Sequence, residues 1–538
     1  MQGRRSETIA PRGMVATSQP LAAQVGLDIL KRGGHAVDAA IAVNAMLGLV
    51  EPMSCGPGGD LFAIVWDAKA ERLYGLNGSG RAPRRMTREL FAARGPQRIP
   101  YRGPLSWTVP GCVDGWFALH GRFGRLPIED LLAPTIDYAN SGFPVSPVIG
   151  RMWAEAEERL RTDPGAAATF LVDGRAPRIG EVVRNPDLAG TLRAIADGGR
   201  DAFYRGPIAD RIVSCAEAVG GLIAVEDLAA HASTWDDPIS IRYRGVDVWE
   251  LPPNGQGIAV LQMLGILEGF DLAGMDPTER LHLEIEAKKL AFEDRARYYA
   301  DPAFVDVPVD GLISLRYAAR RRKHISSSMA ATRVQPGDPR LEAGDTVYLT
   351  VIDEDRGAAS LIQSIYDDFG SGVVPPGTGF ALQNRGSLFH LDPQHPNRLE
   401  PGKRPFHTIV PAFVTRDGRP LLSFGVMGGD MQPQGHVQVL VNHLDLEMDV
   451  QAAGDALRWR HVGSSSPTGG RMTDGGRVLL ESGFPQATID GLCALGHRVE
   501  TRPYGRGFGG YQGIRIDEET GMLHGGTESR KDGCALGY

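Results

Sequence analysis

The chain has 538 residues, of which 42% are hydrophobic and 23% charged, so it can bury a large core and is not an intrinsically disordered protein. Its 57 Lys and Arg residues against 65 Asp and Glu give a formal net charge of -8, which argues against a nucleic-acid surface built on overall basicity. The 69 Gly and 37 Pro residues predict many turns. We therefore expect a turn-rich globular protein with a small-molecule partner.

The five cysteines are scattered and show no CxxC spacing, so the sequence predicts free thiols rather than a disulfide framework or a zinc ribbon. Residues 1–14 carry charge without the apolar stretch of a signal peptide, and no apolar run is long enough for a membrane helix. We expect a cytoplasmic protein that does not contact membranes.

The first elements in chain order are two helices. Apolar residues four apart predict a helix over residues 20–32, which Gly33 and Gly34 would end. The Ala-rich segment 36–50 predicts a second helix, buried on most sides. A Gly-rich turn then leads into a short core strand over residues 61–66. This alternation favours a class that mixes helices and strands.

The middle of the chain contains three segments of different composition. Residues 281–299 have an apolar face and charge pairs four apart, which predicts a long helix. Residues 325–345 are rich in Ser, Gly and Pro without apolar periodicity, which is typical of an exposed, flexible linker. Residues 346–353 and 359–366 are β-branched and apolar runs around a turn signal, which predicts a β-hairpin.

The hairpin predicts a cross-strand pair. If Asp353–Gly357 form the loop, Ile352 lies opposite Ala358. Continuing this antiparallel register places Thr346 opposite Ser364. Residues opposite each other have Cβ atoms about 4.5–5.5 Å apart, which allows their hydroxyl groups to form a hydrogen bond.

Common enzyme signatures are missing from the sequence. It contains no GxSxG, HExxH or GxxxxGK[ST] motif, which argues against α/β-type serine hydrolases, zincins and P-loop enzymes. The glycines from Gly505 to Gly510 match GxGxxG, but the residues that follow predict a turn and a strand instead of a helix. The Gly pair Gly428–Gly429 follows an apolar strand and by itself indicates a turn.

Seven sequence blocks spread over nearly the whole chain can be compared with known families. Three of them are GMVATSQPLAAQVGLDILKRGGHAVDAAIAVNAMLGLVEP near the start, GDTVYLTVIDEDRGAASLIQSIYDDFGSG at the predicted hairpin and SRKDGCALGY at the end. The others lie at Glu286–Pro302, Leu312–Arg322, Lys403–Val414 and the Gly pair. Together they resemble the γ-glutamyltranspeptidase family of N-terminal-nucleophile hydrolases, and they occur in the family's order.

The resemblance implies an α+β fold, a four-layer αββα sandwich, and a precursor that cuts itself between Asp345 and Thr346. Residues 1–345 would become a large subunit that ends in the linker 325–345, and residues 346–538 a small subunit, together forming one catalytic unit. A threonine hydroxyl is a weak nucleophile, but an N-terminal Thr346 has a free α-amine, with a reference pKa near 8, that can act as its base. No metal and no organic cofactor is expected.

The resemblance also implies roles for three further residues. Ser364 occupies the position of a hydroxyl residue that bonds the nucleophile, in agreement with the hairpin register. Gly428 and Gly429 correspond to the Gly pair whose backbone N–H groups form the oxyanion hole. Glycine suits this task because it permits unusual φ angles and a close approach to the substrate carbonyl.

The sequence departs from the family at the residues that bind a glutamyl group. Ser79 stands in place of a carboxylate-binding Arg, Leu388 replaces the Asp that holds the substrate's α-amino group, and Arg385 replaces a Gln. His407 and Thr408 replace a Ser-Ser pair. A buried ammonium without a partner would cost several kcal/mol, so α-amino acid substrates are disfavoured.

Arg385 can instead clamp a carboxylate with two hydrogen bonds, which suits an amide that carries an acid group and no amine. A solvated surface arginine is the alternative interpretation. The further candidate substrate-binding residues are Tyr366, Asn384 and, as a second clamp, Arg81. These departures are similar to those of the atypical family branch that includes oxamate amidohydrolases and related acylases.

The leading hypothesis is an N-terminal-threonine amidohydrolase that acts on a small carboxyl-bearing, oxamate-like amide through an acyl-threonine intermediate. The first alternative is a γ-glutamyl hydrolase or transferase acting on glutathione or other γ-glutamyl amides. The second is an inert relative that serves as a binding protein. The two subunits are expected to stay associated, with a homo-oligomer left open.

Overall fold

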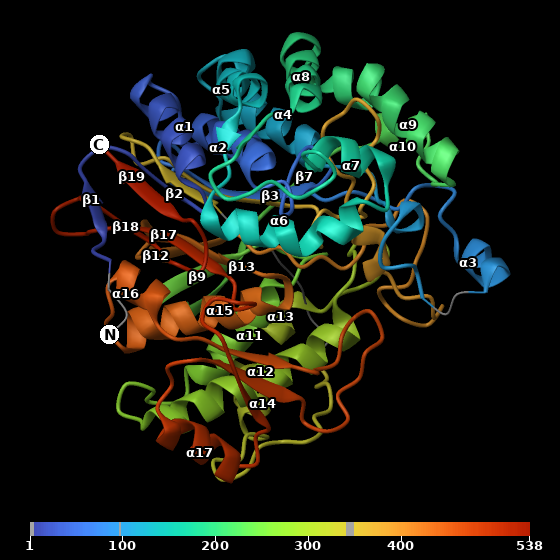
Figure 1. Cartoon of the computed structure of the whole chain (residues 1–538). Coiled ribbons are helices and arrows are strands. Elements are labelled where there is room, and N and C mark those ends of the chain that lie inside the picture. The colour runs from blue at the N-terminus through green and yellow to red at the C-terminus, as the bar shows by residue number, and fades with distance from the viewer. Residues whose placement is uncertain (1–4, 96–97, 340–348) are drawn as a thin grey trace.

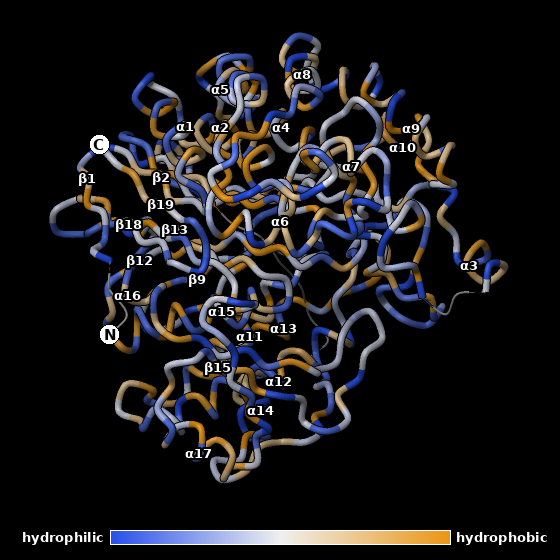
Figure 2. The backbone as a smooth tube through the Cα atoms, in the orientation of Figure 1, coloured by the Kyte–Doolittle hydropathy of each residue, from blue (hydrophilic) through white to orange (hydrophobic). Residues whose placement is uncertain are grey.

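The computed structural model describes residues 5–95, 98–339 and 349–538. Two seven-stranded sheets lie face to face, and helices cover the outer face of each sheet (Figure 1). The hydrophobic stretches of the tube in Figure 2 gather between these layers. The four-layer αββα architecture implied by the resemblance is confirmed.

Every neighbouring strand pair in both sheets is antiparallel. The first sheet has the order β19 (Cys534–Gly537), β2 (Met14–Thr17), β10 (Leu349–Ile352), β11 (Ala358–Ser364), β3 (Asp60–Asp67), β4 (Arg72–Gly78), β7 (Thr234–Asp236). The second has the order β1 (Thr8–Ala10), β18 (Leu523–Thr527), β17 (Gly510–Ile516), β13 (Arg419–Met427), β12 (Ala412–Arg416), β9 (Val246–Glu250), β8 (Ile239–Tyr243).

Strand β3 shows how the layers are built from the sequence. Phe62 and Ile64 point into the core between the two sheets, whereas Ala63 and Val65 point into the core under the helices. Successive side chains of a strand face opposite sides, and both sides are covered here, so the strand is apolar without alternation. This explains the continuous apolar run that predicted a core strand at residues 61–66.

Helices α1, α2, α4, α5 and α8 cover the first sheet, and α11, α12 and α15 cover the second (Figure 1). Their bounds are α1 Pro20–Lys31, α2 Ala36–Val50, α4 Cys112–Phe123, α5 Ile128–Ser141, α8 Pro186–Tyr204, α11 Gly257–Leu267, α12 Pro277–Tyr298 and α15 Gln432–Leu440. The three helices predicted over residues 20–32, 36–50 and 281–299 are confirmed. All residues of α2 are buried, as its composition indicates.

A smaller three-stranded sheet packs near α12 and α17 (Gln486–Ala494). Its strand order is β14 (Trp459–Val462), β15 (Arg477–Glu481), β16 (Val499–Arg502). The remaining α-helices are α3 Arg88–Arg94, α6 Pro147–Leu160, α7 Pro164–Phe170, α9 Pro207–Val219, α10 Val225–Ala229, α13 Val309–Leu312, α14 Leu315–Arg322, α16 Val450–Asp455 and α17 Gln486–Ala494. A two-stranded ribbon pairs β5 (Phe143–Pro144) with β6 (Val182–Val183).

The predicted hairpin is formed by β10 and β11. Ile352 pairs with Ala358, and the register continues without a bulge to Leu349 opposite Leu361. The loop closes with a hydrogen bond from Asp353 N–H to the Gly357 carbonyl at 2.9 Å. The predicted register is therefore confirmed for the described residues, whereas Thr346 lies outside them.

The expected linker 325–345 is described as far as residue 339. Most of its residues are exposed, but Ala330 N–H donates to the Leu495 carbonyl at 2.7 Å and Gly337 N–H donates to Asp294 at 2.7 Å. These contacts attach the segment to α12 and to the loop after α17.

Three further sequence expectations can be compared with the fold. The five cysteines are free. Gly505–Gly509 form a turn that leads into strand β17, which confirms that the GxGxxG match does not open a helix. Among the described residues, no helix combines the length and the apolarity that crossing a membrane requires.

Strands from before and after residue 346 are interleaved in both sheets. In the first sheet, β2 lies between β19 and β10, and β11 lies against β3. In the second sheet, β1 lies on the edge beside β18, and β9 lies beside β12. Neither part of the chain forms either seven-stranded sheet by itself.

Candidate active site

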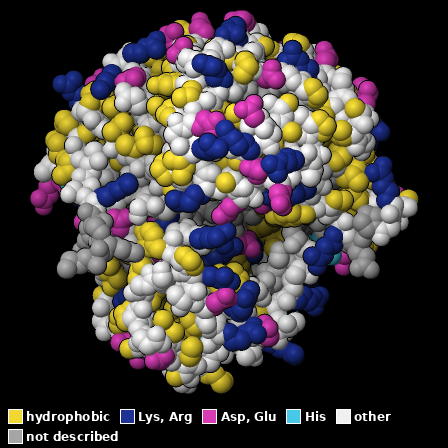
Figure 3. Space-filling view, in the orientation of Figure 1, with side chains coloured by type: hydrophobic (Ala, Val, Ile, Leu, Met, Phe, Trp, Pro, Cys, Tyr) yellow, Lys and Arg dark blue, Asp and Glu magenta, His cyan; other side chains and the backbone are white. Residues whose placement is uncertain are grey.

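A cleft of about 1000 Å³ opens between the two halves of the molecule, and Figure 3 shows a hollow there bordered by charged side chains. Four parts of the chain meet at it: the beginning of β10, the end of β11, the turn after β13 and the end of α2. Leu349, where the described chain resumes, lines this cleft. The predicted nucleophile Thr346 and its neighbour Asp345 lie outside the described residues.

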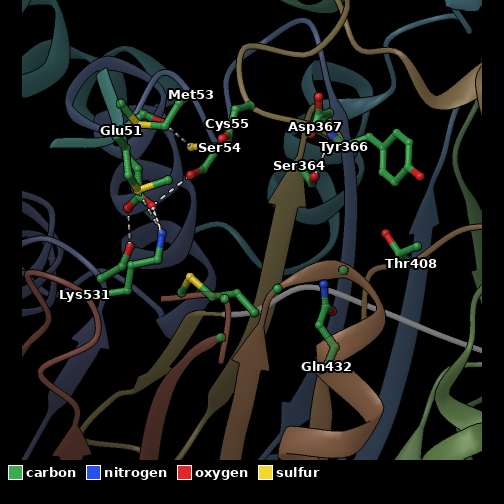
Figure 4. Close-up of a pocket in the computed structure, with 18 of the residues that line it drawn as sticks. Glu51, Met53, Ser54, Cys55, Ser364, Tyr366, Asp367, Thr408, Gln432 and Lys531 are labelled. Atoms are coloured by element: carbon green, nitrogen blue, oxygen red, sulfur yellow. Dashed lines mark hydrogen bonds and ion pairs between the residues drawn. The ribbon is translucent and has the colours of Figure 1, made fainter. Parts of the chain in front are cut away.

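Ser364 ends β11 and lines the cleft near its middle (Figure 4). Its Oγ accepts a hydrogen bond from Tyr366 N–H at 2.8 Å. This contact fixes the oxygen and leaves the hydroxyl proton available for a second partner. A hydroxyl held in this way can donate to a nucleophile placed opposite Ser364 in the sheet.

Gly428 and Gly429 form the turn after β13 and line the cleft. Their φ angles are +129° and +59°, and a Cβ on Gly428 would lie 3.1 Å from Cα of Gly509. Side chains are therefore disfavoured at both positions, most strongly at Gly428.

The Gly turn is held from behind by polar side chains. Gln256 Nε2 donates to the Gly429 carbonyl at 3.2 Å and to the Thr408 carbonyl at 2.9 Å. The next residue, Asp430, accepts a hydrogen bond from the buried Arg295 at 2.6 Å. These contacts fix the peptide planes of the turn, as an oxyanion hole requires.

Arg385 is completely buried just behind two residues that line the cleft. Its Nη1 donates to Thr408 Oγ1 at 2.8 Å, and its guanidinium lies 4.7 Å from the ring centre of Tyr366. Nε and Nη2, which form one edge of the guanidinium, have no hydrogen-bond partner among the described residues. Burial lowers the pKa of Arg385 to about 10, so the side chain stays charged at neutral pH. The interpretation as a solvated surface arginine is wrong.

Asp60 and His407 form a buried pair next to Arg385. His407 Nδ1 accepts from Ile409 N–H at 3.3 Å, so its Nε2–H donates to Asp60 Oδ2 at 3.0 Å. Burial, with the charge of Arg385, lowers the pKa of His407 to about 3. Burial alone would raise the pKa of Asp60, but the hydrogen bond from His407 and the charge of Arg385 hold it below its ordinary value. The pair thus consists of a neutral imidazole that donates a hydrogen bond to an ionised carboxylate.

The other expected substrate-binding residues divide into two groups. Tyr366 and Thr408 line the cleft, whereas Asn384, His407 and Arg81 are not among its described lining residues. Asn384 is buried and bonds the Tyr101 carbonyl at 2.7 Å and Asp367 N–H at 3.2 Å. Its contacts, like those of His407, are within the protein.

The opposite end of the cleft is formed by Glu51, Met53, Ser54, Cys55 and Lys531 (Figure 4). Lys531 Nζ donates to Glu51 Oε1 at 2.8 Å. The carboxylate of Glu51 also accepts from Ser18 at 2.6 Å and from Ser54 at 2.9 Å. This end therefore contains a buried ion pair, and the two ends lie on either side of Ser364.

One cluster of potential metal ligands is found among the described residues, away from the cleft lining. His282, Glu286 and His497 have ligand atoms within 4.8 Å of one another. His282 Nδ1 bonds His497 Nε2 at 2.8 Å, and Glu286 pairs with Lys289 at 2.7 Å. Each group has its partner within the protein, and the nearby ammonium opposes a cation.

Sequence reasoning missed Asp60, Glu51, Lys531 and Gln256. Asp60 ends the motif GPGGD, which indicated only a turn, and Lys531 lies in a block that was used only for the resemblance. Their partners lie far along the chain, so no local pattern identifies them.

Comparison with known proteins agrees with this geometry. The family model for gamma-glutamyltranspeptidase matches residues 22–538. The chain belongs to the γ-glutamyltranspeptidase family. It is thus a hydrolase of amide C–N bonds, in a family of self-processing N-terminal-nucleophile enzymes.

Three similar proteins place the chain within this family. A glutathione hydrolase-like YwrD proenzyme of Bacillus subtilis is 40% identical over 98% of this chain and 99% of its own length. An oxamate amidohydrolase proenzyme of Klebsiella pneumoniae is 37% identical over 99% of this chain and 100% of its own. The crystal structure of cephalosporin acylase from Bacillus halodurans superposes with a TM-score of 0.93, at 46% identity, over 100% of this chain and 98% of its own. The expected atypical branch of the γ-glutamyltranspeptidase family is confirmed.

Proposed function

We propose that this chain cuts itself between Asp345 and Thr346 and then hydrolyses amides whose acyl half carries a carboxylate. One observation carries the proposal: Leu349, three residues after Thr346, lines the same cleft as Ser364 and the Gly428–Gly429 turn. A nucleophile, its hydroxyl partner and an oxyanion turn would then meet at one place. That two relatives are named proenzymes agrees with self-cleavage.

Self-cleavage would begin when Thr346 Oγ attacks the carbonyl carbon of Asp345. The peptide C–N bond breaks, the Thr346 nitrogen takes up a proton, and an ester joins Asp345 to the Thr346 side chain. Water then hydrolyses this ester, which leaves a carboxylic acid on Asp345 and a free amine on Thr346. The amine becomes the base for every later turnover.

Turnover would use the same groups on an external amide. The Thr346 hydroxyl gives its proton to its own amine and attacks the substrate carbonyl, whose oxygen becomes negative near the N–H groups of Gly428 and Gly429. The amine half leaves with the proton, and water hydrolyses the acyl-threonine ester. Ser364 would donate its free hydroxyl proton to Thr346 Oγ and orient it.

Arg385 supports a carboxyl-bearing acyl group. It is a buried cation with one unpaired edge, and an edge of this kind binds both oxygens of a carboxylate. At the same end, Leu388 presents an apolar side chain to the cleft, so it cannot pair with an α-ammonium group. Asp367 also lines the cleft, and its carboxylate is paired with Arg102. An oxamate-like amide fits better than a γ-glutamyl amide.

The test is intact mass spectrometry with N-terminal sequencing, followed by assays of the purified protein. We expect two fragments, the smaller starting at Thr346, and faster release of ammonia from oxamate or succinamate than of p-nitroaniline from γ-glutamyl-p-nitroanilide. The reverse order of rates would favour a γ-glutamyl hydrolase. A single uncut chain without turnover would favour an inert binding protein.

A further inference from the structure

The cleft is larger than a small primary amide requires. Its volume of about 1000 Å³ lies at the upper end of the range for pockets that enclose drug-sized ligands, roughly 300–1000 Å³. The acyl end at Tyr366 and Thr408 accounts for only part of it. The other part lies beyond Ser364, at Glu51 and Lys531 (Figure 4).

Glu51 is an unusual residue for its position. It is the C-cap of α2, where the helix dipole disfavours a negative charge, and it is almost completely buried. Burial would raise the pKa of Glu51, but Lys531 and the hydroxyl groups of Ser18 and Ser54 hold it below its ordinary value. Glu51 is thus an ionised carboxylate whose two oxygens are both occupied. An apolar residue would serve the stability of the helix better.

Lys531 retains unused hydrogen-bonding capacity. An ammonium has three donors, and Lys531 uses one on Glu51. Its one other contact among the described residues is the Met152 sulfur at 3.9 Å. Burial would lower the pKa of Lys531, but Glu51 raises it above its ordinary value, so the cation persists.

Further cations border the same end of the cleft. Arg506 pairs with Glu155 at 3.0 Å, and Arg530 is neutralised by two buried glutamates. Arg460 donates to the Gly507 carbonyl, but its buried Nε has no partner among the described residues. Arg151 has no ion pair within the described part of the chain. Asp368 also lines the cleft, and its charge acts on Lys531. Against this one carboxylate stand Arg151 and Arg460, so this end has a small excess of positive charge.

This end is also connected to the reaction centre. Ile365, directly after Ser364, donates its N–H to the Ser54 carbonyl at 3.2 Å. The Ser54 hydroxyl donates to Glu51, which holds Lys531. Lys531 is therefore positioned through a continuous chain of contacts that begins next to Ser364.

We propose that the Lys531 end is the binding site for the amine half of the substrate and recognises a carboxylate on it. This inference rests on the proposed function and extends it. The preferred substrate would then carry one carboxylate on each side of the scissile amide, as in a dicarboxylic acid joined to an amino acid or to a similar acidic amine. Arg385 would bind the first carboxylate and Lys531 the second.

The test compares two amides that differ only in the amine half, N-succinyl-3-aminobenzoate and N-succinylaniline. We expect kcat/KM to be about tenfold or more higher for the acidic amide, the scale of one charge-assisted hydrogen bond. Glu51→Gln removes the carboxylate that holds the pKa of Lys531 up, so this single variant should weaken the preference. Lys531→Met combined with Glu51→Gln avoids an unpaired buried charge and should reduce the ratio to about one.

Arg32→Gln with Asp130→Asn removes an exposed ion pair away from the cleft lining and serves as the control, which should keep the wild-type ratio. Equal kcat/KM values in the wild type, or a preference that persists in the double variant, would overturn the inference. Calorimetric titration with the two free amine halves, 3-aminobenzoate and aniline, tests the Lys531 site separately from the proposed amide hydrolysis. Lys531-dependent binding of the acid without hydrolysis of either amide would sustain this site and refute the proposed function. No preferential binding would refute the site.

Discussion

Asp60 is the register partner of Ser364 across strands β3 and β11, and its carboxylate accepts hydrogen bonds from His407 and Gln383 at 3.0 and 2.8 Å. The backbone N–H of Gly80 donates to the same carboxylate at 2.8 Å. Asp60 thus joins the end of the hydroxyl-bearing strand to the residues that surround Arg385.

Replacing Asp60 by Asn should destabilise the protein. The Asn side chain has only one acceptor oxygen for three donors, and Arg385 loses a negative charge that raises its pKa. We expect the free energy of unfolding to fall by about 1.5–3 kcal/mol, the usual contribution of a hydrogen bond to a charged group. Urea denaturation measures this value. A change below about 1 kcal/mol would contradict the role of Asp60.

Ser364→Ala should slow turnover by about ten- to a hundredfold because the nucleophile loses a hydrogen-bond donor, whereas Ser364→Thr should retain most of the rate. The measurement is kcat on the best amide found, with the extent of self-cleavage followed on denaturing gels. Equal rates for the Ala and Thr variants would show that the hydroxyl group has no role.

Gly428→Ala should reduce kcat by about 100-fold or more, the usual effect of losing one oxyanion donor. The added Cβ meets the Gly509 backbone at 3.1 Å, and φ of +129° is strained for Ala. Gly429→Ala is the matched comparison because its φ of +59° is milder and no atom lies within 4 Å of the added Cβ. The prediction fails if Gly429→Ala is the more damaging substitution.

Arg385→Met should lower kcat/KM for succinamate by about ten- to a hundredfold while affecting butyramide, which lacks the carboxylate, much less. Arg385→Lys should recover only part of this loss, since an ammonium cannot bind a carboxylate with a planar edge. The ratio of the two kcat/KM values is the readout. An unchanged ratio in the Met variant would exclude Arg385 as the acyl clamp.

Stability should decrease as the pH falls from about 6.5 toward 3. The folded pKa of His407 is about 3, below its unfolded value near 6.5, so the unfolded chain binds more protons in this window. Each such histidine contributes about 1.4 kcal/mol per pH unit, and His436, whose pKa is also lowered to about 3 by burial, should act in the same way. Urea denaturation at several pH values gives the slope, which His407→Gln should reduce by about one proton.

The sequence predicts well what depends on neighbouring residues. Apolar spacing located α1 and α12, the Ala-rich composition of residues 36–50 located α2, and the turn signal at residues 353–357 predicted the hairpin register. Contacts between distant segments could not be predicted in this way. His407 lies 347 residues from Asp60, and Lys531 lies 480 residues from Glu51.

Two of the expected substrate-binding residues, His407 and Asn384, are held by partners within the protein. His407 was expected to touch substrate because of its place in a motif, but its partner Asp60 comes from β3 and occupies it completely. Asn384 is likewise held by the Tyr101 carbonyl and by Asp367. Burial and long-range pairing decide which polar groups remain available for a ligand, and neither can be deduced from a local pattern.

The interleaved strand order has a consequence for what a cut before residue 346 can do. Strand β2 is hydrogen-bonded on one side to β10 and on the other to β19, both of which follow the cut. Separating the fragments would require breaking strand pairs in the middle of both sheets, so the rate of dissociation would equal the rate of global unfolding. The cut would behave as a nick in a single folded body, and dilution alone would not release either piece.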